Sequence, residues 1–426
     1  MSQTEQAKGF PLWSKHYVKI ILASCLVSSC MFFHNAVTTL YVVSIGGAAS
    51  YAGVMLTCFT IVATIMRIVA GRLVDIKGRR RIILIGLVIY AAATASITIE
   101  YLPYLPFARA LQAIGYSMTT TGIAVALTDV IPIPQMGEGL GYSMLANNVA
   151  SALGPIIALG IYSLTENYAI VYYVSICLLA VSFVIMMFCR YEADKEFFER
   201  KRSYELAVLG ARAESAGPKA DGGKRSLLST LFAKEALPST ITGIFIFLGN
   251  GAIVAYIVLY ATEIQIEKAS LFFTLQAIMT ITTRLLFAKL SDKYPPLVSI
   301  IPGTLILVLG YDFLVAAPNQ HLFFYLAGAA LGMGGGIATP ALNAEAVRYV
   351  PQSRRGAASA TFFMATDIGI GIGGVLWGKI LDRSGFRPVF LGCILCICIA
   401  IVLSIIFFSG ARGKKRPGPS QEPTGA

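Results

Sequence analysis

The sequence predicts an all-α polytopic membrane protein with twelve transmembrane helices in two pseudo-symmetric six-helix bundles. The chain of 426 residues is 56% hydrophobic and only 13% charged, which leaves too few charges to cover a soluble core of this length. Apolar runs of about 20 residues, each long enough to cross about 30 Å of hydrocarbon as a helix, recur along the chain. An internal repeat, described below, divides these runs into two halves.

Twelve apolar runs are long enough to span a bilayer. In the first half they cover residues 17–45, 51–75, 81–99, 102–130, 138–163 and 167–190. In the second half they cover residues 237–262, 268–292, 296–316, 320–348, 354–381 and 386–409. Because the number is even, both termini are expected on the same side of the membrane.

Lysine and arginine indicate which side that is. They gather in the connections after even-numbered spans, whereas the opposite connections are nearly free of them. We therefore expect a cytoplasmic N-terminus at 1–16, an N-terminal bundle at 17–190, a cytoplasmic linker at 191–236, a C-terminal bundle at 237–409 and a basic cytoplasmic tail at 410–426. The net charge of +12 is spread between the spans, so it predicts topology and lipid contact and no nucleic-acid partner. The absence of an Asn-x-Ser/Thr site favours the plasma (inner) membrane of a bacterium.

The two halves repeat at an offset of 217 residues. "RIVAGRLVD", which begins at Arg67, returns as "RLLFAKLSD", which begins at Arg284. The same offset relates "PQMGEG" to "PQSRRG", Gly115 to Gly332, and Gly154 to Gly371. One offset at four separated places predicts two parallel bundles related by an axis along the membrane normal, with a path for a solute between them.

Three motifs resemble the major facilitator superfamily. "GRLVDIKGRRR" is similar to that family's signature between helices 2 and 3, in which Gly71, Leu73, Asp75, Gly78 and the arginines 79–81 all fit. "RALQAIG" resembles the helix 4 motif through Arg109, Gln112 and Gly115, with Ala113 where glycine is usual. "ASALGPIIALG" resembles the antiporter motif of helix 5 through Gly154 and Pro155, with Ala150 and Ala158 in place of two glycines.

The resemblance covers essentially the whole chain and implies alternating access by rocking of the two bundles. The helix 5 motif implies the drug/proton antiporter type, with Gly154 and Pro155 as a helix-bend motif. Asp75 is implied to pair near the start of span 11 and so to latch the outward-facing state. The expected latch residues, which include gate charges near the cytoplasmic ends of spans 4 and 10, are Gly71, Asp75, Gly78, Arg79, Asp129, Glu345 and Arg348.

Asp367 is the strongest candidate for proton coupling. It lies about 13 residues, or roughly 20 Å, into span 11, near the middle of the bilayer. A buried carboxylate without a nearby cation can carry a proton at physiological pH, whereas the alternative is a helix-helix hydrogen bond. Arg109 in span 4 is expected to tune Asp367 by family analogy, or else to snorkel outward. Arg67 and Arg284, on the inner third of spans 2 and 8, are expected to be gate charges.

Polar side chains at helical spacing predict a solute cavity lined by spans 1, 4, 5, 7, 8, 10 and 11. His34 lies one step off the polar stripe of span 1, and a structural role is favoured for it over protonation. The expected cavity residues are Asn35, Thr38, Gln112, Tyr116, Asn147, Asn250 and Asn343.

The sequence predicts no enzyme, no cofactor and no metal site. The charge-rich "GRLVDIKGRRR" lacks the G-K-[ST] of a phosphate loop, and the eight cysteines lie in apolar segments where small filler residues are common. The leading hypothesis is proton-coupled export of a small amphipathic or drug-like molecule, and the expected partners are that molecule, protons and the bilayer around a monomer. Two alternatives stay open: a transporter of a polar metabolite such as a sugar, a peptide or a metal-chelating opine, and, more remotely, a membrane sensor or scaffold that does not transport.

Overall fold

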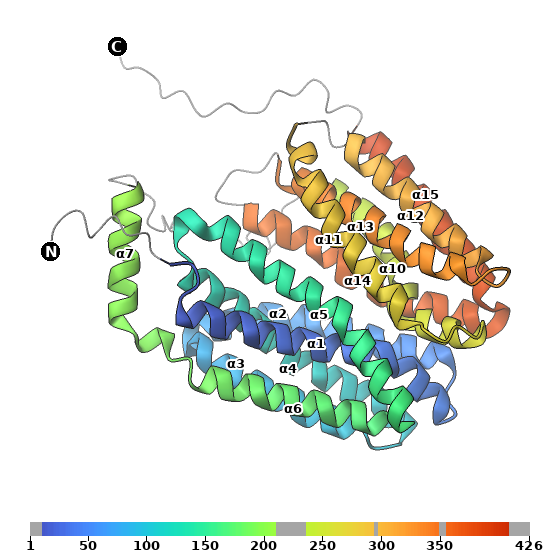
Figure 1. Ribbon diagram of the computed structural model, residues 1–426, viewed down its shortest axis with the longest axis horizontal. Helices are drawn as coiled ribbons and strands as arrows, with labels where there is room; N and C mark the ends of the chain where they lie inside the picture. The colour runs from blue at the N-terminus through green and yellow to red at the C-terminus, as the bar shows by residue number, and fades with distance from the viewer. Residues whose placement is uncertain (1–10, 210–235, 294–296, 349–354, 409–426) are drawn as a thin grey trace, which may run out of the picture.

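A computed structural model describes residues 11–209, 236–293, 297–348 and 355–408 (Figure 1). Within these ranges the chain is helical and contains no strand. Three single turns of 3₁₀-helix lie at Leu102–Tyr104, Ile133–Gln135 and Tyr191–Ala193. The long helices are α1 (Lys15–Ser44), α2 (Ala49–Lys77), α3 (Arg79–Ile97), α4 (Leu105–Val130), α5 (Met136–Thr165), α6 (Tyr168–Met187), α7 (Lys195–Leu209), α10 (Leu237–Glu263), α11 (Ser270–Lys293), α12 (Leu297–Ala316), α13 (Leu322–Arg348), α14 (Arg355–Ser384) and α15 (Phe386–Phe408).

A long helix lies at each of the twelve expected spans, so the fold class predicted from the sequence is confirmed. Ten helices in the described ranges are long and apolar enough to cross a membrane by length and composition alone. Neither α4 nor α11 is among the ten, and each of the two carries an arginine and a glutamine within its length. These side chains face the protein interior or its cavity, as described below, so packing compensates for their polarity.

The helices form two bundles, α1–α6 and α10–α15, that lie side by side (Figure 1). Close glycine contacts hold helices together within each bundle. A Cβ added to Gly86 would lie 2.9 Å from Gly115 O, and one added to its repeat mate Gly303 would lie 2.9 Å from Ala338 N. In a membrane, helices associate mainly through such small-residue packing, since lipid is as apolar as the helix faces.

The two bundles touch most closely along the antiparallel helices α2 and α14. Near one end the Ser50 N–H donates to Asp382 Oδ1 at 3.3 Å. One turn further on, a Cβ added to Gly53 would lie 2.1 Å from Gly374 O and 2.2 Å from Tyr256 Oη. The bundles are therefore closed at the Ser50 end, and in Figure 1 they splay apart toward the opposite end, which carries α7.

Helix α7 packs across the end of the N-terminal bundle. Asp194 caps it, because Asp194 Oδ1 accepts from the Phe197 N–H at 3.0 Å while Oδ2 contacts His16 Nε2 at 2.9 Å. Lys201 Nζ donates to Asp129 O at 2.6 Å, which ties the helix to the end of α4. The linker predicted at 191–236 is thus helical where it begins, and its residues 210–235 lie outside the described part of the chain.

Candidate functional site

A central cavity of about 500 Å³ lies between the bundles. Helices α1, α2, α4 and α5 line it from one side, and α10, α11, α13 and α14 line it from the other. The seven spans expected to line a cavity all do so, and α2 is an eighth. The polar side chains in the wall are Asn35, Thr60, Arg67, Tyr116, Asn148, Ser151, Asn250, Gln276, Thr280, Arg284, Thr339, Thr366 and Asp367.

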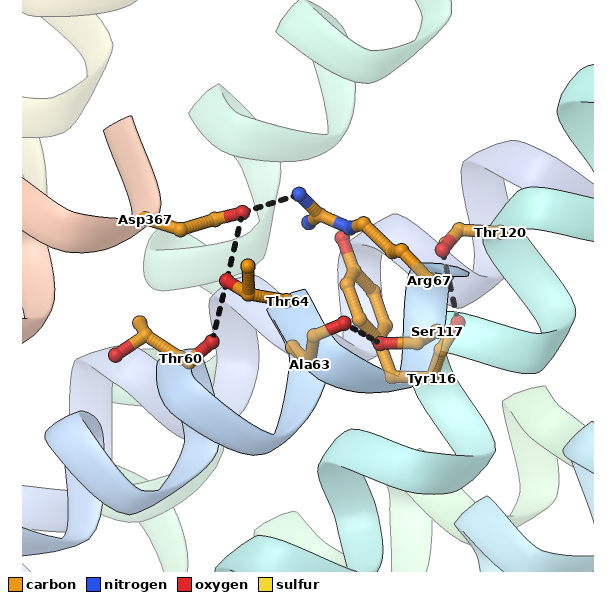
Figure 2. Close-up of polar contacts among 8 residues, drawn as sticks. All are labelled: Thr60, Ala63, Thr64, Arg67, Tyr116, Ser117, Thr120 and Asp367. Carbon is orange, nitrogen blue, oxygen red and sulfur yellow. Dashed lines mark hydrogen bonds and ion pairs between the residues drawn. The ribbon is translucent and has the colours of Figure 1, made fainter. Parts of the chain in front are cut away.

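Asp367 lies on the cavity wall in an ion pair with Arg67 (Figure 2). Arg67 Nη1 donates to Asp367 Oδ2, and the Thr64 hydroxyl lies 3.4 Å from the same oxygen. The Thr64 hydroxyl also lies 2.8 Å from Thr60 O, and Figure 2 shows the Tyr116 ring beside the Arg67 side chain. Positions 60, 64 and 67 share one face of α2 because a helix repeats every 3.6 residues.

This ion pair crosses from one bundle to the other. Arg67 belongs to α2 and Asp367 to α14, so the pair lies at the inner end of the contact that begins at Ser50 and Asp382. Only 15% of the Asp367 side chain is exposed, against 42% of the Arg67 side chain. Removing Arg67 would leave the nearly buried Asp367 carboxylate uncompensated, which is costly in a low-dielectric interior.

Arg109, which was expected to tune Asp367, makes its contacts elsewhere in the described part of the chain. Arg109 is 1% exposed inside the N-terminal bundle, where its Nη1 donates to Gln112 Oε1 at 2.8 Å and its Nη2 to Asn35 Oδ1 at 3.1 Å. Its guanidinium lies 4.9 Å from the centre of the Phe59 ring. The premise that Asp367 has no nearby cation is wrong, because Arg67 pairs with it. Depth along a helix can be counted in the sequence, but the neighbouring helix that a side chain faces cannot.

The expected cavity residues divide into three groups. Asn35, Tyr116 and Asn250 line the central cavity, and Asn343 lines a side cavity of about 350 Å³. Thr38 and Gln112 do not reach either cavity; they are buried inside the N-terminal bundle, where the Thr38 hydroxyl bonds His34 O and Gln112 Nε2 donates to Thr94 Oγ1. Asn147 is exposed away from the cavity, and its neighbour Asn148 lines the wall instead. A helix turns by about 100° per residue, so an error of one position changes the face.

His34 lies inside the N-terminal bundle and away from the cavity. It is fully buried, and its Nδ1 lies 3.5 Å from both Tyr90 Oη and Gln112 Nε2. Its ring also packs against Tyr172, with centroids 5.3 Å apart. This environment fits the structural role that was favoured for it.

Arg284 and Gln276 of α11 were not among the expected cavity residues. Arg284 stood as a gate charge, and the repeat was the signal that could have placed it on the wall, since its mate is Arg67. Gln276, Thr280 and Arg284 recur every four residues on one face of α11, and Thr60, Thr64 and Arg67 follow at spacings of four and three on one face of α2.

The residues of the expected latch lie near the α7 end. Gly78 has a φ of +88°, a conformation that favours glycine, and it separates α2 from α3. Arg79 Nε donates to Asp129 Oδ2 at 2.9 Å, and the Arg79 N–H donates to Glu192 Oε1 at 2.6 Å. These contacts fix the turn within the N-terminal bundle.

The remaining latch residues are Gly71, Asp75, Glu345 and Arg348. Asp75 is exposed and has no ion pair in the described part of the chain, and residues 349–354, just before α14, lie outside that part. A Cβ added to Gly71 would meet nothing within 4 Å. At the end of α13, Arg348 Nη1 lies 3.2 Å from Glu345 Oε2. The pairing expected of Asp75 thus stays a prediction.

The helix-bend motif lies within α5. Pro155 is inside this helix and lines the cavity, and its ring cannot supply the backbone hydrogen bond to residue 151. A Cβ added to Gly154 would lie 2.6 Å from Phe32 Cβ, so α5 packs closely on α1 at this point.

Two helical bundles around a central cavity with polar side chains in its wall are the architecture of alternating-access membrane transporters. The chain belongs to the Major Facilitator Superfamily, whose family model matches residues 20–374 and 241–425.

Bacterial proteins are among the curated relatives. An uncharacterised MFS-type transporter of Burkholderia pseudomallei (strain K96243) is 31% identical over 207 residues, which is 48% of this chain and 50% of the relative. One of Pseudomonas aeruginosa (strain UCBPP-PA14) is 34% identical over 172 residues, which is 40% of this chain and 42% of the relative. The chain thus spans about half the length of the curated relatives it matches.

Solved structures share the fold at low sequence identity. The nucleoside transporter NupG superposes with a TM-score of 0.65 at 14% identity, over 94% of this chain and 100% of that one. A POT family transporter in complex with a thioalcohol-conjugated peptide gives 0.72 at 14% identity, over 93% of this chain and 96% of that one. At this identity the likeness concerns the fold alone.

Proposed function

We propose that the protein is a secondary active exporter that exchanges protons for a small amphipathic molecule by alternating access. The observation that carries this proposal is the Arg67–Asp367 ion pair, which joins the two bundles and faces the cavity at the same time. A group with both properties can couple protonation to bundle movement. Protonation of Asp367 would remove the ionic attraction between α2 and α14, because a neutral carboxyl no longer compensates Arg67.

The proposed cycle follows from this geometry. With the Ser50 end closed, Asp367 is paired with Arg67 and the cavity accepts its solute from the α7 end. Opening of the Ser50 end separates α2 from α14, and solvent from that side then reaches Asp367 and protonates it. The protonated, solute-free carrier closes the Ser50 end again, and re-formation of the ion pair expels the proton on the α7 side. Arg109 acts indirectly, because its hydrogen bond to Asn35 holds that cavity residue in place.

The orientation in the membrane is part of the proposal. The α7 end carries Lys77, the arginines 79–81 and Arg190, whereas the connection at residues 45–48 carries no charge. The positive-inside rule places the basic end in the cytoplasm of a bacterial plasma membrane. Solute therefore moves outward as protons move inward.

The test uses purified protein in vesicles that contain a pH dye and an imposed pH gradient. Added substrate is expected to dissipate the gradient with the wild-type chain. Asp367→Asn should lose this pH-driven transport at least tenfold, while exchange of solute for solute continues because the cavity is intact. Asp382→Asn is the matched control on the same helix, since an amide oxygen can still accept from the Ser50 N–H. Full pH-driven transport in Asp367→Asn would rule out Asp367 as the proton carrier.

A second candidate function is transport of a polar metabolite such as a sugar, a peptide or a metal-chelating opine. The amides of Asn148, Asn250 and Gln276 in the cavity wall favour it, because amides hydrogen-bond polar solutes in both directions. The nucleoside and peptide transporters among the structural neighbours share only the fold and do not decide between the two candidates. Counterflow of these solutes without response to amphipathic compounds would support the second candidate, and a flat response to every solute would favour a sensor or scaffold.

A further inference from the structure

Arg284 is a cavity cation that pairs with no acid in the described part of the chain. Its Nη1 lies 3.4 Å from Asn148 Oδ1, and no acid in the described ranges lies within salt-bridge distance of it. The repeat makes the contrast with Arg67 explicit: the position equivalent to Asp367 in the first half is Ala150. The central cavity is therefore lined by two arginines and one aspartate among its described residues, and its net charge is positive when Asp367 is ionised.

Arg284 lies where two cavities meet. It lines the central cavity and also the side cavity of about 350 Å³, and Thr339 and Phe363 do the same. The side cavity has a mainly apolar wall. This wall is contributed by Met144, Ile337, Pro340, Ala344 and Phe363.

Three buried polar atoms of residues that line the two cavities have no hydrogen-bond partner among the residues that the structure describes. They are Arg284 Nε, Ser299 Oγ in the side cavity and Thr366 Oγ1 in the central cavity. Each can donate a proton, and an unsatisfied buried donor is destabilising unless something occupies it. A hydrogen-bond acceptor would satisfy all three, and the strongest acceptor for a guanidinium is an anion.

We propose that Arg284 is the anion-binding subsite of the transported solute, and that the solute is an amphipathic organic monoanion. Its carboxylate, or a chemically similar acidic head, binds the guanidinium of Arg284, and its apolar body fills the side cavity beside Phe363. The proposal rests on the proposed transport function, because it names the substrate class of the same cavity. A cationic solute would instead face two arginines, and a neutral one would leave Arg284 uncompensated.

Binding of dansylglycine tests this proposal directly. The probe joins one carboxylate to an aromatic body, and its fluorescence rises in an apolar site. Dansylglycinamide is the matched neutral compound. Both are titrated into the full-length protein in nanodiscs of zwitterionic lipid at pH 7.5, with no gradient present. A charge-assisted hydrogen bond adds about tenfold or more to affinity, so the acid is expected to bind at least tenfold tighter than the amide.

Variants assign the preference to one residue. Arg284→Gln is expected to bring the ratio of the two affinities to about one while the amide binds as before, and Arg284→Lys should keep part of the preference. Arg383→Gln, at an exposed arginine near the end of α14, is expected to behave as wild type. Equal affinities in the wild type, no saturable binding of the acid, or a preference that survives in Arg284→Gln would each overturn the proposal.

The binding measurement and the vesicle assay test the two proposals independently. Proton coupling does not enter the binding experiment, since no gradient is imposed. A lost acid preference together with intact Asp367-dependent transport would refute the anion subsite alone. Acid-selective binding without any pH-driven transport would refute the proton-coupled function and keep the subsite.

Discussion

An alanine at Gly53 should drive the closed end of the bundles apart. The new Cβ would lie 2.1 Å from Gly374 O and 2.2 Å from Tyr256 Oη, whereas ordinary contact begins at 3.4 Å. The backbones of α2 and α14 must therefore separate by about 1 Å, because a helical carbonyl cannot turn away. Such overpacking costs about 1–3 kcal/mol. The cost falls only on the state closed at the Ser50 end, so the equilibrium shifts toward the opposite state by about 5- to 150-fold.

Distances between spin labels measure this shift. One label pair, at Leu164 and Leu322, reports on the closed end, and a second pair, at Ile76 and Val298, reports on the α7 end; all four side chains are exposed. The labels are introduced as cysteines after the eight native cysteines have been replaced. In Gly53→Ala the first distance should lengthen and the second should shorten.

The control is another helical glycine with free space around it. A Cβ added to Gly160 would meet nothing within 4 Å, so Gly160→Ala should leave both distance distributions as in the wild type. Unchanged distances in a folded Gly53→Ala protein, or an equal response in both variants, would refute the argument that this glycine contact sets the balance between the two states.

Three further predictions concern other parts of the molecule. Asp75→Ala should reduce turnover about fivefold, equivalent to about 1 kcal/mol of lost state stabilisation, while membrane insertion stays normal; wild-type turnover in the vesicle assay would contradict the latch. Gly332→Ala should lower the free energy of unfolding by about 1–3 kcal/mol in a denaturant titration, because its Cβ would lie 2.1 Å from Gln276 O, and unaltered stability would show that α11 and α13 can move apart freely. Asp194→Ala should speed hydrogen exchange in α7 by the loss of a cap worth about 1 kcal/mol. Hydrogen bonds from His16 and the Phe197 N–H lower the pKa of the Asp194 carboxyl, so the wild-type cap should be complete above the ordinary aspartate pKa and be lost only as the pH falls through the lowered value; loss already at pH 6 would be inconsistent with it.

The fold follows from sequence because its causes are local and repeated. Each apolar run is long enough to span a bilayer, and within a bilayer a spanning segment must satisfy its own backbone hydrogen bonds, which makes it a helix. The repeat at 217 residues then requires two similar bundles. Even Gly86 and Gly303, which share this offset, prove to be points of close helix contact in both halves.

The candidate site could be predicted from the sequence only in part. Asp367 is conspicuous because an acid in the middle of an apolar run is rare, and its depth can be counted along the helix. The partner of Asp367 could not be identified by counting along the helix, because Arg67 lies 300 positions earlier and reaches Asp367 through the packing of α2 on α14. Arg109 looked equally suitable in the sequence, yet its side chain bonds Asn35 of α1 and Gln112 of its own helix.

What the sequence alone determined is therefore the set of helices, their number, their repeat and the rarity of each buried charge. The tertiary structure alone decided what each cavity arginine meets: Arg67 pairs with Asp367, whereas Arg284 contacts Asn148 and no acid among the described residues. The physical reason is that helix formation in a membrane depends on hydrophobicity and backbone hydrogen bonds within one segment, whereas the pairing of side chains depends on the rotation of one helix against another. That rotation is set by many small packing contacts distant in sequence, such as Gly53 against Gly374.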